Sequence, residues 1–66
     1  MDKQKVGQRL RELRGRRTLE EVANALGISR QSLWAYETGF RVPRDPLKVK
    51  IARYYRKTVQ QIFFAE

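Results

Sequence analysis

The chain has 66 residues, enough for one small hydrophobic core. It contains neither cysteine nor histidine, so we expect no disulfide, no metal site, no cofactor, and no thiol or imidazole catalysis. Fifteen lysines and arginines against seven acidic residues give a net charge of +8, which favours a polyanionic partner such as nucleic acid.

The first expected helix lies near the N-terminus and ends at Gly15. Val6, Leu10 and Leu13, at spacings of four and three, form one apolar stripe among charged residues. Arginines near Gly15 suit a helix C-terminus, where the helix dipole is negative.

The second expected helix opens at the segment TLEE, which is a capping box. Thr18 caps the helix and Glu21, three residues on, reaches back to it. The apolar face consists of Leu19, Val22, Ala23 and Leu26, and Gly27 then ends the helix in a left-handed turn.

Ser29 is the expected N-cap of a third helix, which runs from Arg30 to about Thr38 and is closed by Gly39. Leu33 and Tyr36 are expected to point inward. The outward face then consists of Arg30, Gln31, Trp34, Ala35 and Thr38.

Two further helices follow the irregular segment FRVPRDP. Asp45 is the expected N-cap of the fourth, with Pro46 at its first position. The fourth helix is expected to bury Leu47, Ile51, Ala52 and Tyr55, and the last, opened by a second capping box at TVQQ, carries Val59, Ile62 and Phe63. The fold class is therefore all-α, with five short helices in one domain over residues 1–66.

Residues 18–39 have the spacing of a helix-turn-helix. Ala23 is small where the second helix of the pair must pass closely, Gly27 supplies the turn, and Leu33 packs back onto the first helix. The N-terminal part of such a second helix meets base edges in the major groove. Because arginine pairs bidentately with guanine and glutamine with adenine, Arg30 and Gln31 predict a DNA-reading face.

Trp34 has two interpretations: it packs sideways onto the fourth helix, or it contacts a sugar or a thymine methyl at the groove wall.

The chain resembles the Cro and phage-repressor type of helix-turn-helix protein, also called the xenobiotic-response-element family, in the segment TLEEVANALGISRQSLWAYETG. The likeness continues into PLKVKIARYYRKTVQQIFF and covers roughly residues 6–64. The resemblance implies a compact five-helix, lambda-repressor-like domain. It also implies a cytoplasmic, nucleoid-associated regulator of a bacterium or phage that binds double-stranded DNA as a dimer.

The resemblance also implies roles for individual residues. The base-reading positions fall on Arg30, Gln31, Trp34 and Ala35, and the phosphate-binding positions on Ser32, Arg41 and Arg44, to which we add the outward-facing Thr38. A structural ion pair is expected between Arg14 and Glu37. Leu19 stands where the family often has glutamine, so no side-chain contact with DNA is expected there.

Specific DNA binding normally needs two small modules, which read half-sites about 34–36 Å apart. We expect a homodimer formed through the C-terminal helices. Ile62 is most simply a core residue, but it stands with Phe40, Tyr54 and Phe64 among the residues expected at the dimer interface.

The function predicted from the sequence is a transcription regulator, more specifically a repressor, that binds an inverted-repeat operator, because the chain leaves no room for a ligand domain. The alternative is an antitoxin-type module that neutralises a partner toxin and represses its own promoter. A membrane-surface helix is disfavoured because the apolar stripes are spread over several capped helices, and no apolar run approaches the roughly 20 residues of a membrane span. Enzymatic activity and a small-molecule ligand are not expected.

Overall fold

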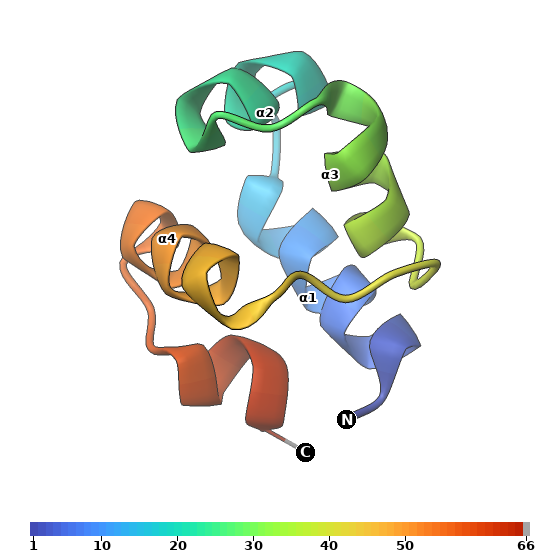
Figure 1. Ribbon diagram of the computed structural model, residues 1–66, viewed down its shortest axis with the longest axis vertical. Helices are drawn as coiled ribbons and strands as arrows, with labels where there is room; N and C mark the ends of the chain where they lie inside the picture. The colour runs from blue at the N-terminus through green and yellow to red at the C-terminus, as the bar shows by residue number, and fades with distance from the viewer. Residues whose placement is uncertain (66) are drawn as a thin grey trace.

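The computed structural model describes residues 1–65, which form five helical elements and no strand (Figure 1). They are α1 (Lys3–Arg14), α2 (Leu19–Leu26), α3 (Arg30–Glu37), α4 (Asp45–Tyr55) and one turn of π-helix, η1 (Gln60–Phe64). The expected all-α fold is confirmed. None of the helices in this part of the chain is long and apolar enough to cross a membrane.

Side-chain caps set most of the helix beginnings. Asp2, Thr18 and Ser29 each accept hydrogen bonds from backbone N–H groups in the first turn of α1, α2 and α3. The capping box before η1 is reciprocal: the Thr58 N–H donates to Gln61 Oε1 at 2.9 Å, and the Gln61 N–H donates to Thr58 Oγ1 at 3.0 Å. These short-range contacts explain why helices this short begin where they do.

The expected N-cap of α4 is wrong by one residue. Arg44 has the extended backbone of an N-cap, and its carbonyl accepts from the N–H groups of Leu47 and Lys48. Asp45 is already helical, and its carboxylate accepts from Lys48 Nζ at 3.1 Å instead of capping the backbone. Pro46 is tolerated as the second helical residue because a first-turn N–H has no partner within the helix.

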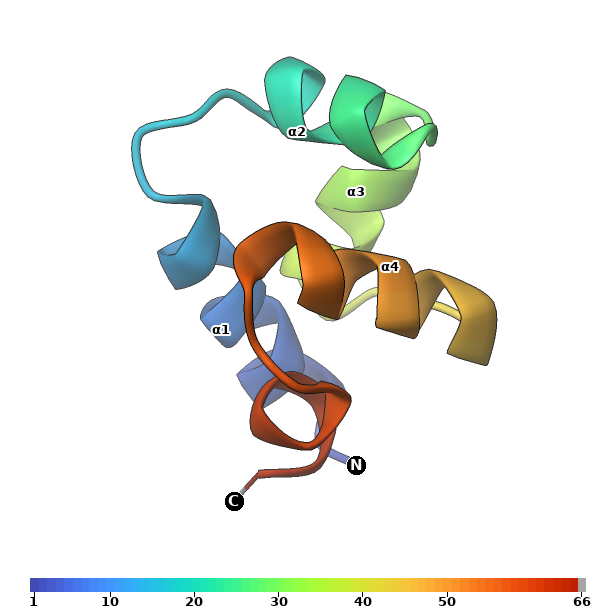
Figure 2. The same ribbon diagram turned by 90° about the vertical axis from the view of Figure 1, so that its left-hand side faces the viewer.

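One hydrophobic core joins all five elements. α2 and α3 lie at one end of the molecule and η1 at the other, with α1 running between them, and both chain termini lie near η1 (Figures 1 and 2). The core consists of Val6, Leu10, Val22, Ala23, Leu26, Leu33, Ile51, Ala52, Ile62 and Phe63. These are the apolar stripes of the sequence brought together, which is why such short helices are stable.

Arg9 fastens η1 to α1. Its Nη1 donates to the carbonyl oxygen of Ile62 at 2.8 Å, and its Nη2 donates to that of Ala65. The guanidinium therefore ties two backbone carbonyls to α1, one within η1 and one directly after it.

α1 and α3 cross with their backbones in contact at Gly7. A methyl group on Gly7 would lie 2.5 Å from the carbonyl oxygen of Glu37 and 2.8 Å from that of Tyr36. Real Cβ atoms do not approach backbone oxygens so closely, so only glycine allows this crossing. Gly7 thus determines how deeply α3 sits against α1.

We expect Gly7→Ala to destabilise the fold by about 1–3 kcal/mol, because the added methyl must push α3 away from α1. This outcome runs against helix propensity, which favours alanine over glycine by about 1 kcal/mol. The measurement is urea unfolding followed by circular dichroism. Gln8→Ala is the control, since Gln8 is exposed in the same helix and should change stability by less than about 0.5 kcal/mol. A Gly7→Ala protein as stable as the wild type would contradict the close-contact argument.

Candidate nucleic-acid interface

The turn between α2 and α3 has the geometry that its sequence predicts. Gly27 adopts φ 71° and ψ 30°, a left-handed conformation that suits glycine. The N–H of Ile28 donates to the carbonyl oxygen of Ala23 at 3.0 Å, which closes the end of α2. Ala23 and Leu33 are both buried where the two helices meet. Residues 18–39 therefore form a helix-turn-helix.

A buried ion pair anchors α3 to α1. Arg14 Nε donates to Glu37 Oε2 at 2.8 Å, and Glu37 is only 5% exposed. Arg14 Nη1 also donates to the carbonyl oxygen of Arg17 at 2.6 Å. The hydrogen bond to Glu37 raises the pKa of Arg14 above its ordinary value. The structure thus brings together the two residues expected to pair.

Tyr55 of α4 lies near this pair. Among the described residues, its hydroxyl is the buried side-chain polar group without a hydrogen-bond partner. Burial raises the pKa of Tyr55 to about 12, and the negative charge of Glu37 adds to the effect. The phenol is therefore held neutral, while Glu37 has its charged partner in Arg14.

The outward face of α3 begins with Arg30 and Gln31, both exposed. Trp34, one turn further on, is 53% exposed and lines a shallow pocket with Arg30, Gln31 and Leu19. Its exposure argues against the interpretation that Trp34 packs onto α4. Because the first acid of α3 is the buried Glu37, the exposed part of this helix carries no negative charge.

Ala35 does not lie on this face, and the expectation that it does is wrong. It is 7% exposed, too buried to reach a base edge. The carbonyl oxygen of Ala35 accepts from the N–H of Phe40 at 2.9 Å and from that of Arg41 at 3.2 Å. These two bonds tie the segment after α3 to the end of the helix.

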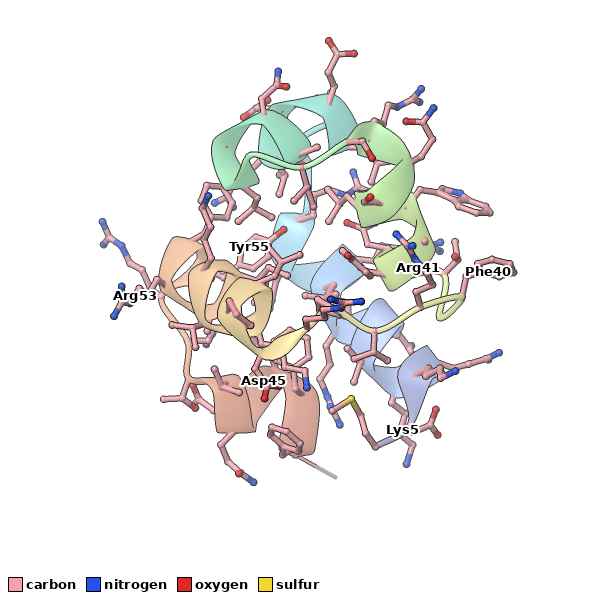
Figure 3. All side chains as sticks on the ribbon, viewed as in Figure 1. Lys5, Phe40, Arg41, Asp45, Arg53 and Tyr55 are labelled. Atoms are coloured by element: carbon pink, nitrogen blue, oxygen red, sulfur yellow. The ribbon has the colours of Figure 1, made fainter. Side chains whose placement is uncertain are left out.

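The residues expected to hold phosphates lie at both ends of α3. Arg41 folds back along the helix: its Nη2 donates to Ser32 Oγ at 3.4 Å, and its guanidinium lies 5.7 Å from the ring centroid of Tyr36. Arg44 is exposed and lines a shallow pocket with Arg41. Thr38 is half-buried, and its hydroxyl donates to the carbonyl oxygen of Trp34 at 2.9 Å. Figure 3 shows Arg41 beside α3.

Comparison with known proteins agrees with this geometry. A family model described as a helix-turn-helix domain matches residues 5–61. The chain belongs to the helix-turn-helix family of DNA-binding transcription regulators. An uncharacterized HTH-type transcriptional regulator of Methanocaldococcus jannaschii is 39% identical over 49 residues, which make up 74% of each protein. The crystal structure of the clp gene regulator ClgR from C. glutamicum has the same fold, with a TM-score of 0.78, 23% identity and coverage of 94% of this chain and 83% of that one.

The residues expected at the dimer interface of this helix-turn-helix protein do not form one patch. Ile62 is 1% exposed and belongs to the core, so it is not available for an interface. Tyr54 is half-buried, with its ring 5.0 Å from that of Tyr55 and beneath the guanidinium of Arg17 at 5.4 Å. Phe40 is exposed beyond the end of α3 (Figure 3), whereas the exposed Phe64 belongs to η1.

Two residues that hold the helices together were not predicted from the sequence. Gly7 determines the depth of α3, and Arg17 stacks on the tyrosines of α4. The first had a signal, because an isolated glycine within a helical pattern often marks a close approach of another backbone. No sequence signal could reveal the role of Arg17, since its stacking depends on where α4 lies in the fold.

Arg14→Met is expected to lower the free energy of unfolding by about 3 kcal/mol, because it leaves the Glu37 carboxylate buried without its cation. The double variant with Glu37→Leu should regain most of that loss. Asp45→Asn is the control: it breaks an ion pair at the aspartate, whose side chain is 92% exposed, so the loss should stay below about 1 kcal/mol. Equal losses in the two single variants, measured by urea unfolding, would show that the buried pair is no stronger than an exposed one.

Tyr55 makes stability depend on alkaline pH. Between pH 10.0 and about 12 the phenol of the unfolded chain has lost its proton while that of the folded chain keeps it. Unfolding then releases a proton, so stability falls as pH rises through this window and is unaffected by Tyr55 below it. Tyr55→Phe should be at least as stable at neutral pH, since it removes an unpaired buried hydroxyl, and should lose less stability in the window. Parallel stability curves for wild type and variant, from urea unfolding across the pH range, would refute this assignment.

Proposed function

We propose that this regulator recognises a specific operator by placing the N-terminal half of α3 in the major groove of double-stranded DNA. The observation that carries the proposal is that Arg30 and Gln31 are exposed on the first turn of a helix whose other side is fully anchored. Ser29 caps that turn, Leu33 is buried in the core, and Glu37 is held by Arg14. The two side chains are thus presented from a rigid base, which lowers the cost of ordering on binding.

The proposed base contacts follow from the chemistry of these side chains. Arg30 donates bidentately to O6 and N7 of guanine, and Gln31 pairs with N6 and N7 of adenine. Each such contact is worth about 1–3 kcal/mol of discrimination against other bases. Trp34 lies one turn further along the same face, where it contacts a sugar or a thymine methyl.

The proposed phosphate contacts come from the two sides of this face. Arg41 and Arg44 lie in the segment after α3, and Ser32 supplies a hydroxyl group. The Thr38 hydroxyl donates to a phosphate by giving up its hydrogen bond to the carbonyl oxygen of Trp34. Arg41 is already oriented by Ser32 and Tyr36, so its guanidinium is placed before DNA arrives. Such contacts position a protein on the duplex without reading its sequence.

We further propose that two copies bind an inverted repeat and that the bound dimer represses transcription. A single small module buries only about 600–1,000 Å² on DNA, so a two-fold pair reading half-sites about 34–36 Å apart supplies the missing affinity. Of the residues predicted at the dimer interface, Phe64 is the one that is exposed on η1. It lines a shallow pocket together with Met1. Repression needs only occupancy of the operator, in the cytoplasm where the nucleoid lies.

The test is selection of binding sites from a random duplex pool with the wild type, Arg30→Ala and Arg53→Ala. The two variants lose the same charge, but Arg53 projects from α4 on the opposite side of the molecule from α3 (Figure 3). We expect the wild type to enrich an inverted repeat with half-sites one helical turn apart. Arg30→Ala should relax the preference for one guanine in each half-site, and Arg53→Ala should leave the selected sequence unchanged.

A pool in which nothing is enriched would refute sequence-specific binding. A site without two-fold symmetry would refute the dimer while leaving base reading by α3 intact. If both variants change the selected sequence equally, the effect comes from net charge and not from a base contact.

A further inference from the structure

Phe40 is the most exposed large apolar side chain among residues 1–65, at 74%. It lies at the tip of the segment that leaves α3 and projects away from the rest of the chain (Figure 3). The proposed base and phosphate contacts make no use of it, and it lies after α3, whereas Phe64 belongs to η1. A ring of this size gains favourable burial when a partner surface covers it.

The turn that carries Phe40 is ordered by the protein itself. Gly39 adopts φ 80°, and a methyl group on it would lie 3.2 Å from Gln4 Cα, so the turn rests against the start of α1. The N–H groups of Phe40 and Arg41 both donate to the carbonyl oxygen of Ala35. The backbone at Phe40 is therefore fixed relative to α3.

The position of Phe40 along the chain indicates which part of the DNA it would meet. Phe40 directly precedes Arg41 and lies four residues before Arg44, the two proposed phosphate contacts. When those two residues hold phosphates, Phe40 therefore lies beside the sugar–phosphate backbone.

The charge around Phe40 distinguishes between two partners that could cover its ring, DNA and a second copy of the chain. Phe40 is followed directly by Arg41, and Arg44 is exposed nearby in the same segment. A second copy would bring the same cations to a chain that already carries +8, whereas the DNA backbone brings phosphates. The complementary partner is therefore the polyanion.

We propose that the Phe40 ring packs against the deoxyribose of a backbone nucleotide whose phosphate is held by Arg41. This inference rests on the proposed function and adds an apolar contact to it. The contact neutralises no phosphate and touches no base edge. Phe40 therefore strengthens binding without changing its salt dependence or its sequence preference.

The experiment measures the affinity of Phe40→Ala, Arg41→Ala and the wild type for two short duplexes, one of mixed sequence and one carrying the selected site, between about 50 and 200 mM salt. Val49→Ala is the matched control, since Val49 is an apolar residue of α4 with 42% exposure. Thermal unfolding checks that each variant is folded, and sedimentation without DNA gives its association state.

Phe40→Ala should weaken binding about five- to tenfold on both duplexes, with the same slope of log affinity against log salt as the wild type. Arg41→Ala should reduce the magnitude of that slope by about one, and Val49→Ala should match the wild type. An unchanged affinity for Phe40→Ala, a loss on the selected duplex alone, or a change in association state without DNA would overturn the inference and leave the proposed function standing. A wild type that binds neither duplex would overturn both.

Discussion

The position of the DNA-reading helix depends on the buried contact between α1 and α3. α3 has eight residues, too few to be a stable helix in water by itself. Gly7 lets the two backbones touch, and the ion pair between Arg14 and Glu37 holds the C-terminal end of α3 against α1. A charged pair in this place is directional, because one carboxylate and one guanidinium fit in few orientations. The orientation of Arg30 and Gln31 therefore derives from α1, a helix that carries none of the proposed base-reading residues.

The same arrangement separates the charges of α3. Its single acid is turned inward and paired, so the exposed side keeps Arg30 and a positive field suited to phosphates. An exposed glutamate on this helix would repel the DNA backbone, whereas the buried one contributes to the anchor. Burying a carboxylate is costly unless it is paired, and the partner also supplies the hydrogen bond that the carboxylate loses from water. The stability of the fold and the positive charge of the exposed side of α3 thus both depend on the burial of Glu37.

Features of the fold that depend on neighbouring residues could be predicted from the sequence. Thr18 and Ser29 cap, Gly27 turns, and the apolar stripes at helical spacing form the core, because each signal lies within one or two turns of the chain. The wrong predictions concern burial, which depends on how segments far apart in the sequence pack together. Ala35 is predicted to lie on the outer face but is only 7% exposed, and Ile62 is predicted at the dimer interface but is a core residue with 1% exposure. At Asp45 two local signals competed, and the aspartate bonded to Lys48 instead of the backbone.

The turn after α3 links reading of bases to contact with the backbone. The carbonyl oxygen of Ala35 accepts from Phe40 and Arg41, so the segment that reaches the phosphates is tied to the helix that carries Arg30. In the proposed complex, phosphate contacts set the register of the protein on the duplex and base contacts exploit that register. A loose segment would allow phosphates to be held with α3 at several depths. Because the turn is bonded to α3 and rests against α1 at Gln4, one register for the backbone implies one depth for Arg30 and Gln31.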